Sequence, residues 1–373
     1  MPEIINHHLS NIRPNRGVAL LMVLLIVLAI TILATGFLAR ADSELACGAN
    51  ALLRMQMDQV AESGLEHARG LVLHPQDVPA AFWANGAMGQ RLAETSRDYY
   101  DLQVSQDPNQ VTNRGTFDII SEAYRIVGGQ QIARSRLAAT LRLDPCIALG
   151  VGADTSLWNG MNVYGDVYAR NTLTNNGAID GDVFAVSLLG TGTQTGQLNP
   201  QTLTLAWPPV TAAYVNPSYS VRLVAATLPA GLYAPDSIWR SAGDLRISGT
   251  ATIKGMLFVP GNLTISAGAG ASQIRAAPNL PALYVGGNLI IENLNGLQID
   301  GLVVVDHDVQ ISATASYVRI AGGLFVGGTL SGPGSMVTVI VDPMKAAVVA
   351  GAIGSQTCWS PAAGGFFRCM QRL

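Results

Sequence analysis

The amino-acid sequence predicts an α+β chain in which a long N-terminal helix carries a small α+β head, followed by a mainly β domain of the parallel β-solenoid type. Three observations predict this organisation. An uncharged apolar run lies near the start, an amphipathic helical pattern continues it, and a short β pattern then recurs at a period near 20 residues. The length of 373 residues favours two domains beyond the apolar run, because one domain holds about 100–200 residues.

The apolar run, residues 18–39, contains no charged side chain. As a helix with a rise of about 1.5 Å per residue, it spans the roughly 30 Å of a bilayer's hydrocarbon core. Arg13 and Arg16 precede the run, so the positive-inside rule predicts a cytoplasmic N-terminus and periplasmic C-terminal domains, as in a single-pass protein of a bacterial inner membrane. A cleaved secretory signal is excluded, because its apolar core covers only about 7–15 residues.

The sequence RGVAL, from Arg16, marks the start of this run. It resembles the class III signal of type IV pilins and type II secretion pseudopilins, in which a prepilin peptidase cuts after the glycine and the apolar segment is retained. The resemblance implies a leader of residues 1–17, with Arg13 and Arg16 as its basic flank and cleavage between Gly17 and Val18. Val18 would then be the candidate for N-methylation. An ordinary single-pass anchor with an accidental glycine is the alternative.

The fifth mature position holds Met22, where most pilins have a glutamate. In the family, that glutamate is thought to pair with the N-terminal amine of a neighbouring subunit inside the filament, where an unpaired charge is costly. Variants without it, with starts similar to RGVALLMVLLIVLAITILA, are the PilX-type minor pilins and the K-type minor pseudopilins at filament tips. The resemblance covers about residues 16–143. It implies as partners the inner membrane, the prepilin peptidase, and other minor pilins and the major pilin through the stem helix.

An amphipathic helical pattern follows the apolar run over residues 40–74. The apolar stripe consists of Leu53, Met57, Val60, Gly64, Ala68 and Leu71, and the opposite face carries Arg54, Asp58, Glu62, Glu66 and Arg69. Pro75 ends the pattern, which gives one continuous helix of roughly 55 residues, about 80 Å long. An unrelated helix joined to a membrane anchor would show the same stripe, so the stripe supports the fold more than the function.

The head is expected to comprise residues 75–145, with mixed α and β character. Alternating residues in the last part predict a solvated face with arginines and an apolar face that packs on the stem helix. A basic binding surface is the alternative use of that arginine face. The expected elements are a short helix over 80–93, a strand over 99–105, and a hairpin over Phe117–Leu143 that turns at Gly128 and Gly129.

One β pattern repeats through residues 146–342: an apolar pair, a turn of Gly with Asp or Asn, and an apolar-alternating strand. The copies are NVYGDVYA from Asn162, IDGDVFAV from Ile179, SAGDLRIS from Ser241, LFVPGNLTI from Leu257, LYVGGNLII from Leu283, VVVDHDVQI from Val303 and LFVGGTLSG from Leu324. The turns at Gly243, Gly261, Gly287, His307 and Gly328 are 18, 26, 20 and 21 residues apart.

This spacing predicts a parallel β-solenoid, similar in texture to bactofilin-like β-helices, because each coil exposes an apolar face until the next coil covers it. The asparagine and aspartate side chains at the turns are expected to hydrogen-bond the adjacent backbone. A sandwich or barrel of antiparallel strands is the runner-up. The Pro-rich stretch 197–240 breaks the repeat and is expected to be an insertion.

Asp300, Asp306, His307 and Asp308 form the acidic cluster that could bind calcium or act as acid and base. However, residues 306–308 occupy the same slot as the Gly-Asn turns, so they are predicted to be a substituted turn. We therefore expect no catalytic residue, no metal and no cofactor. The net charge of −3 without a basic patch also argues against nucleic acid as a partner.

The four cysteines belong to a chain that is predicted to be exported, so a disulfide is expected for a close pair. Cys358 and Cys369 enclose a short loop and are the candidate pair, which would contribute roughly 2–3 kcal/mol. Cys47 and Cys146 are expected to be too far apart to pair. Residues 343–373, which include the loop, are expected to cap the last coil of the solenoid.

Together these observations predict a PilX-like minor pilin or pseudopilin, and not an enzyme. Its stem helix would pack with those of other subunits to start a filament in which this head lies outermost, with a surface or a glycan as the ligand of the solenoid. The alternative is a membrane-tethered periplasmic β-helix protein that binds or acts on carbohydrate. A polymerising scaffold is a third hypothesis.

Overall fold

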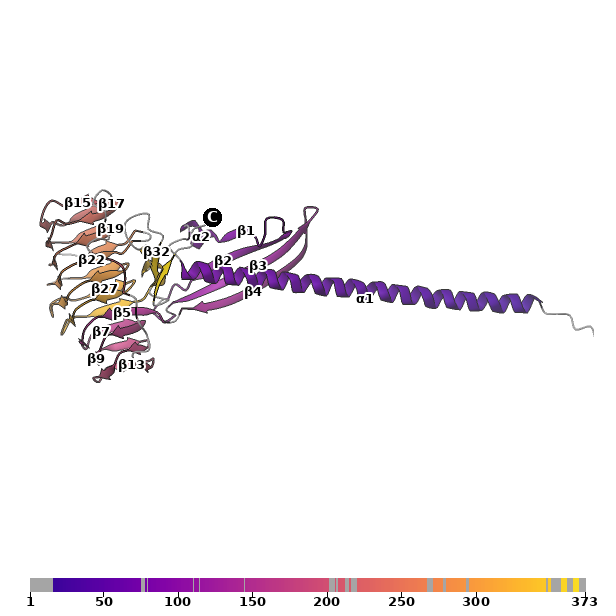
Figure 1. Cartoon of the computed structure of the whole chain (residues 1–373), viewed down its shortest axis with the longest axis horizontal. Coiled ribbons are helices and arrows are strands. Elements are labelled where there is room, and N and C mark those ends of the chain that lie inside the picture. The colour runs from indigo at the N-terminus through magenta and orange to yellow at the C-terminus, as the bar shows by residue number, and fades with distance from the viewer. Residues whose placement is uncertain are drawn as a thin grey trace, which may run out of the picture.

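A computed structural model shows a long helix, a sheet that packs on one end of it, and a stack of β coils that lies crosswise beyond the sheet (Figure 1). The chain thus has the long apolar N-terminal helix and the β-rich, mostly parallel, solenoid-like domain predicted from the sequence. The described residues are 16–346, apart from 75–77, 79, 110, 114, 144, 201–204, 206, 212–214, 216–219, 267–270, 278–279 and 293–294, together with 348–349, 357–360 and 365–368.

Helix α1 (Arg16–Leu73) is continuous over 58 residues, which corresponds to about 87 Å. No proline interrupts it. The predicted stripe is confirmed: Met57, Val60 and Ala68 are buried, whereas Leu71 is half-buried and its neighbour Val72 takes the buried position. The second half of α1 is therefore a packing surface for the head.

The head is an antiparallel sheet in the order β1-β2-β3-β4, with α1 against one face. Its elements are α2 (Ala80–Asn85), β1 (Ala87–Arg91), β2 (Asp98–Gln106), β3 (Thr116–Val127) and β4 (Gln130–Arg142). The predicted hairpin at Gly128 and Gly129 is confirmed, with apolar residues of β4 turned inward and its arginines outward. The helix expected over 80–93 was too long, because Gly86 ends α2 with a φ of 74° and the chain then enters β1.

Gly64 is the point of closest approach between α1 and the sheet. A Cβ atom on Gly64 would lie 2.1 Å from Ser121 Oγ and 3.0 Å from the Tyr100 ring. Only glycine lets the helix backbone come this near to β3, which accounts for a glycine in a helix interior despite a cost of about 1 kcal/mol. Three further glycines of α1, Gly36, Gly48 and Gly70, have open space around them.

The solenoid-like domain consists of parallel coils with three short strands in each turn of the chain. Inward residues stack into ladders, such as Leu263, Leu289 and Val309, and these positions are buried. The first half contains β5 (Ile147–Val151), β6 (Thr155–Leu157), β7 (Met161–Tyr164), β8 (Asp166–Ala169), β9 (Thr172–Asn175), β10 (Ala178–Asp180), β11 (Val183–Phe184), β12 (Ser187–Leu189), β13 (Thr193–Gln194) and β14 (Leu198–Asn199).

The second half includes the two long strands β17 and β19, of 10 and 9 residues. It contains β15 (Val221–Arg222), β16 (Thr227–Leu228), β17 (Gly231–Arg240), β18 (Leu245–Ile247), β19 (Ala251–Val259), β20 (Leu263–Ile265), β21 (Ser272–Arg275), β22 (Leu283–Val285), β23 (Leu289–Ile291), β24 (Leu297–Asp300), β25 (Val303–Val305), β26 (Val309–Ile311), β27 (Val318–Ala321), β28 (Leu324–Val326), β29 (Leu330–Ser331) and β30 (Val337–Ile340). After it come α3 (Pro343–Ala346), β31 (Val348–Val349), β32 (Thr357–Ser360) and β33 (Gly365–Arg368), the last three forming a small antiparallel sheet.

The coils are not stacked in sequence order. Strand β5 pairs with β28 on one side and with β8 on the other, while β30 pairs with β27 and with β7. The chain therefore enters the rod in its middle, winds to the end at β13 and β14, and resumes at the opposite end with β15 (Figure 1). From there it winds back to the middle. We call the coil formed by β30, β5 and β6 the seam.

A strap connects the two ends of the rod. Its described residues include Leu205, Trp207, Val210 and Val215, which lie in one apolar cluster with outward residues of the coils. The sequence predicts that the whole segment 197–240 is an insertion. In the structure, only its middle part lies outside the coils. The ends of the segment contribute strands β14 to β17 to the coils, and the part between β14 and β15 covers a face of the rod.

A ladder of side-chain carbonyls joins successive turns of the second half. The side chains of Asp244, Asn262, Asn288 and Asp308 each accept a hydrogen bond from the backbone amide of the next coil, at 2.7, 2.8, 3.0 and 2.6 Å. The bonded residues are 18, 26, 20 and 21 positions apart, the spacing between turns in the sequence. These side chains do hydrogen-bond backbone amides, but the amides belong to the neighbouring coil and not, as the sequence predicts, to the adjacent backbone of the same turn.

The rod joins the head at its seam. Gln106, at the end of β2, donates from Nε2 to Asp342 Oδ1 at 3.0 Å, and Asp342 directly follows the last coil. Where the chain enters the rod, the backbone amide of Cys146 donates to the buried carboxylate of Asp166 at 2.6 Å. Among the described residues, the entry of the chain into the rod and the bond from Gln106 to Asp342 therefore both lie at the middle of the rod.

The ladder generates a prediction for Asp308. We expect Asp308→Ala to lower the free energy of unfolding by about 1 kcal/mol, because the amide and the hydroxyl of Thr329 both lose their acceptor. Asp308→Asn keeps a carbonyl oxygen, as Asn262 and Asn288 do, and should lose less. The measurement is thermal unfolding of the full chain in detergent, followed by circular dichroism. Equal melting temperatures for wild type and Asp308→Ala would contradict the role of the ladder.

The same site gives a pH dependence. The backbone amide of Thr329, then its hydroxyl, lower the pKa of Asp308 below its ordinary value. A carboxyl with a lowered folded-state pKa stabilises the fold above its unfolded pKa, and this contribution is lost as the pH falls through the folded-state value. The stability difference between wild type and Asp308→Ala should therefore shrink below about pH 4.

Candidate functional site

The first half of α1 is a continuous apolar surface. From Val18 to Leu38 its large apolar side chains are 52–70% exposed, on all sides of the helix. Of the described residues, this is the one helix that is long and apolar enough to cross a membrane. An apolar surface of this extent needs a cover of lipid or of other apolar helices.

The hydroxyl groups in this half are bonded within the helix. Thr31 Oγ1 donates to the carbonyl of Val27 at 2.7 Å, and Thr35 Oγ1 lies 2.9 Å from the carbonyl of Ile32 and 3.0 Å from that of Thr31. No other side chain between residues 18 and 39 has a polar oxygen or nitrogen. The segment can therefore lie in an apolar environment without an unpaired polar side chain.

The apolar half ends at an ion pair. Arg40 Nε lies 2.9 Å from Glu44 Oε1, and both side chains are largely exposed. An exposed i, i+4 pair of this kind is worth a few tenths of a kcal/mol, whereas placing its charges at the centre of a bilayer would be costly. Residue 40 therefore marks where the surface of α1 changes from apolar to polar.

The residues of the predicted cleavage site lie at the start of α1. Arg16 and Gly17 are its first two residues, and Val18 is the first of the exposed apolar side chains. Met22 is 62% exposed in the same surface. Arg13 lies outside the described residues. Cleavage after Gly17 and methylation of Val18 stay predictions.

The predicted acidic cluster is divided between two corners of the coil. Asp300 accepts ion pairs from Arg319, Arg275 and Lys345, at 3.5, 3.9 and 3.9 Å. The other group follows β25, where Asp306 Oδ2 accepts from the buried Tyr284 hydroxyl at 2.6 Å and Asp308 caps Thr329. Burial, and then Asp306, raises the pKa of Tyr284. The turn prediction for residues 306–308 is confirmed, and each of the three carboxylates has a structural partner.

In the part of the chain that the structure describes, no group of three His, Cys, Asp or Glu side chains is arranged so that it could hold a metal ion. Cys47 is an exposed free thiol on α1, and Cys146 is buried where the chain enters the rod. The two therefore form no disulfide with each other. Cys358 lies in β32, and its predicted partner Cys369 falls outside the described residues.

The strap is a covering segment that the sequence analysis does not predict. Trp207 packs edge-on against Phe325 of β28, with ring centroids 5.5 Å apart. The signal was present in the strands LYV, VVV and LFV, whose outward residues Tyr284, Val304 and Phe325 break the alternation of apolar and polar side chains. A strand that is apolar on both sides has both faces covered. This pattern could have indicated a covering segment.

No protein-family model matches this chain, and neither a curated protein nor a solved structure matches it. The resemblance to pilins at the N-terminus is therefore supported only by the residues that carry it, from Arg16 onward.

The exposed surface of α1 generates a prediction for thiol labelling. In intact spheroplasts, a membrane-impermeant maleimide should label Cys47, because it is an exposed thiol beyond the end of the apolar half. The matched variant Leu28→Cys places a thiol at a position that is 52% exposed in the chain itself but would be covered by lipid. Peptide mass spectrometry identifies the labelled residue. Labelling of the thiol introduced by Leu28→Cys before detergent is added, or of Cys47 only after lysis, would contradict the expected topology.

Proposed function

We propose that this chain is a minor pilin or pseudopilin of a type IV pilus or a type II secretion-like system, which helps to start the filament and is displayed at its tip. The observation that carries the proposal is the coincidence of two features. The uncharged exposed surface of α1 begins at Val18, directly after the glycine of the RGVAL junction, and the same helix continues without a break into the head.

The chemistry of this surface suits transfer from one apolar environment to another. Residues 18–39 have no charge and no unpaired hydroxyl, so the helix can leave lipid and pack among other apolar helices without stripping water from a polar group. Met22 stands where pilins that repeat along a shaft have a glutamate. A subunit with an apolar residue there lacks the carboxylate that would face the amine of a neighbouring subunit, which favours a terminal position.

The orientation of the rod supports the same position. The rod lies crosswise at the end of α1 and extends to both sides of it (Figure 1). In a filament whose subunits repeat along the shaft, such a rod would meet the heads of its neighbours. At a tip it has free space, and it presents its long faces outward. The proposed role is therefore assembly by the stem and display by the rod.

Substitution of Gly17 tests this proposal. In cells that assemble the filament, the wild-type chain should have a mature mass that starts at Val18, free or methylated. Gly17→Val should retain residues 1–17 and reduce filament number at least about tenfold, because the uncut leader keeps its charged flank at the start of α1. Gly70→Val is the matched control, since Gly70 lies in the same helix but outside residues 18–39, with open space around it.

Intact mass spectrometry and filament counts by electron microscopy provide the two readouts. The proposal fails if Gly17→Val has the same mature mass and the same number of filaments as wild type. A wild-type chain that retains Met1–Gly17 in a strain with an active prepilin peptidase would also contradict it.

A further inference from the structure

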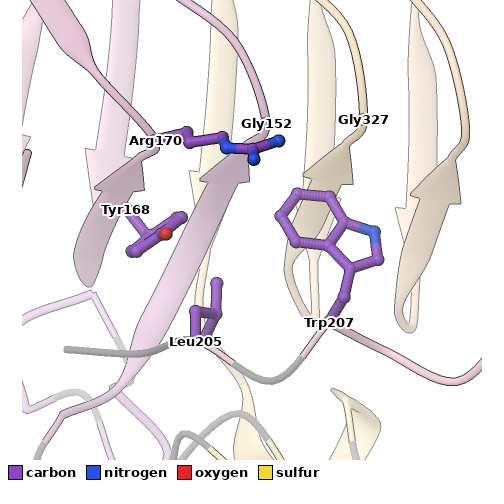
Figure 2. Close-up of a pocket in the computed structure, with 6 residues that line it drawn as sticks. All are labelled: Gly152, Tyr168, Arg170, Leu205, Trp207 and Gly327. Carbon is purple, nitrogen blue, oxygen red and sulfur yellow. The ribbon is translucent and has the colours of Figure 1, made fainter.

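A hollow of about 310 Å³ opens where the strap crosses the seam. It lies between side chains of the strap on one side and turns of three neighbouring coils on the other (Figure 2). The residues that line it are Gly152, Tyr168, Arg170, Leu205, Trp207 and Gly327. These come from segments that are far apart in the sequence, and the seam brings them together.

The stacking of the coils creates this hollow. The register that pairs Val326 with Val151 and Val151 with Ala169 places Gly327, Gly152 and Arg170 in one row. A Cβ atom on Gly152 would lie 2.4 Å from the Gly327 carbonyl oxygen, and one on Gly327 would lie 2.2 Å from the Asp306 carbonyl oxygen. Side chains are therefore excluded from two successive positions of the row, which leaves a gap beside Arg170.

A second row explains the aromatic walls. Phe325, Gly150 and Tyr168 occupy equivalent outward positions in successive coils. Because Gly150 has no side chain, the Phe325 ring leans over it, with Cδ1 2.6 Å from the place of a Cβ atom, and Leu205 Cδ2 lies 3.5 Å from the same point. Trp207 stands beside Phe325. Figure 2 shows Tyr168 and Arg170 on one side of the hollow and Trp207 on the other.

The floor of the hollow supplies few donors. The amide of Gly152 donates to the Val326 carbonyl and that of Gly327 donates to the Val305 carbonyl, both at 2.8 Å. Recognition must therefore come from the side chains: the guanidinium of Arg170, the phenol of Tyr168 and the indole of Trp207. This combination suits a ligand with one anionic group and one apolar ring face.

We propose that the hollow binds one carboxylate-bearing sugar residue, of the uronic acid class, within an acidic polysaccharide. The C–H face of a pyranose ring stacks on Trp207 or Tyr168, and its carboxylate accepts forked hydrogen bonds from Arg170. The volume is at the lower end of the roughly 300–1,000 Å³ of small-molecule sites, which fits one or two sugar units. This inference rests on the display role proposed above, to which it gives a ligand class.

The test uses the full chain in detergent micelles, with trigalacturonic acid as the probe and its methyl ester as the matched neutral ligand. Isothermal titration should show that the acid binds and that the ester binds at least about tenfold more weakly, a difference of about 1.4 kcal/mol. Trp207→Ala and Arg170→Gln should each weaken binding of the acid at least about tenfold. Arg246→Gln should not, because Arg246 lies on another face of the rod, where it pairs with Glu292.

Three results would overturn the inference: no binding of the acid, equal binding of acid and ester, or unchanged binding in both pocket variants. Circular dichroism establishes that each variant is folded. If Trp207→Ala does not fold, the inference is tested by Arg170→Gln alone, because Arg170 is exposed and its substitution should leave the fold intact. Cleavage after Gly17 is measured on the same preparations by mass, so a failure of sugar binding is distinguished from a failure of the filament proposal.

Discussion

The arrangement of the rod on the head depends on the seam, a coil built from two segments at opposite ends of the domain sequence. The backbone amide of Val337 donates to the Gly160 carbonyl at 3.0 Å, and Trp158 Nε1 donates to the Ser335 carbonyl at 2.8 Å. Without this coil, both halves of the rod would expose a strand edge and an open apolar interior. The seam therefore couples the folding of the first coil to that of the last.

The position of the rod follows from the seam. A solenoid wound in sequence order is entered at one end and left at the other, so it would extend the stem end-on. Here the entry of the chain and the bond from Gln106 to Asp342 both lie at the middle, and Lys345 of α3 reinforces them, with its Nζ 3.3 Å from Asp342 Oδ2. The rod is thus held crosswise, with the strap along one face. The proposed tip position and the sugar-binding hollow both depend on this geometry.

The sequence predicts those parts of the structure that local periodicity determines. The stripe from Met57 to Ala68, the hairpin at Gly128 and the spacing of the turn ladder are each visible within one segment. The order of the coils is not visible within one segment. A buried side chain such as that of Val326 can stack equally well on any aliphatic neighbour, and nothing in the repeat specifies Val151 as its partner. Long-range register of this kind is determined by how the two halves close on each other.

The same distinction applies to the candidate sites. A peptidase reads a contiguous motif, so Gly17 and Val18 can be singled out from the sequence. The hollow is formed by Arg170, Trp207 and Gly327, which only the seam and the strap bring together. Proline-rich composition predicts a loop for the strap, whereas its tryptophan and valines cover the outward apolar residues of the coils. The two sites therefore differ in how far local sequence can reveal them.

An engineered disulfide across the seam tests this architecture most directly. Asn162 and Thr338 are paired on neighbouring parallel strands, and their side chains are half-buried and alternate with inward ones. Adjacent strands are about 4.8 Å apart, within the Cα separation of a disulfide. In the full-length double variant Asn162→Cys and Thr338→Cys, mild oxidation followed by peptide mass mapping should show a link between these two positions. A rod wound in sequence order would place them at opposite ends, and the absence of the link in a folded chain would contradict the account.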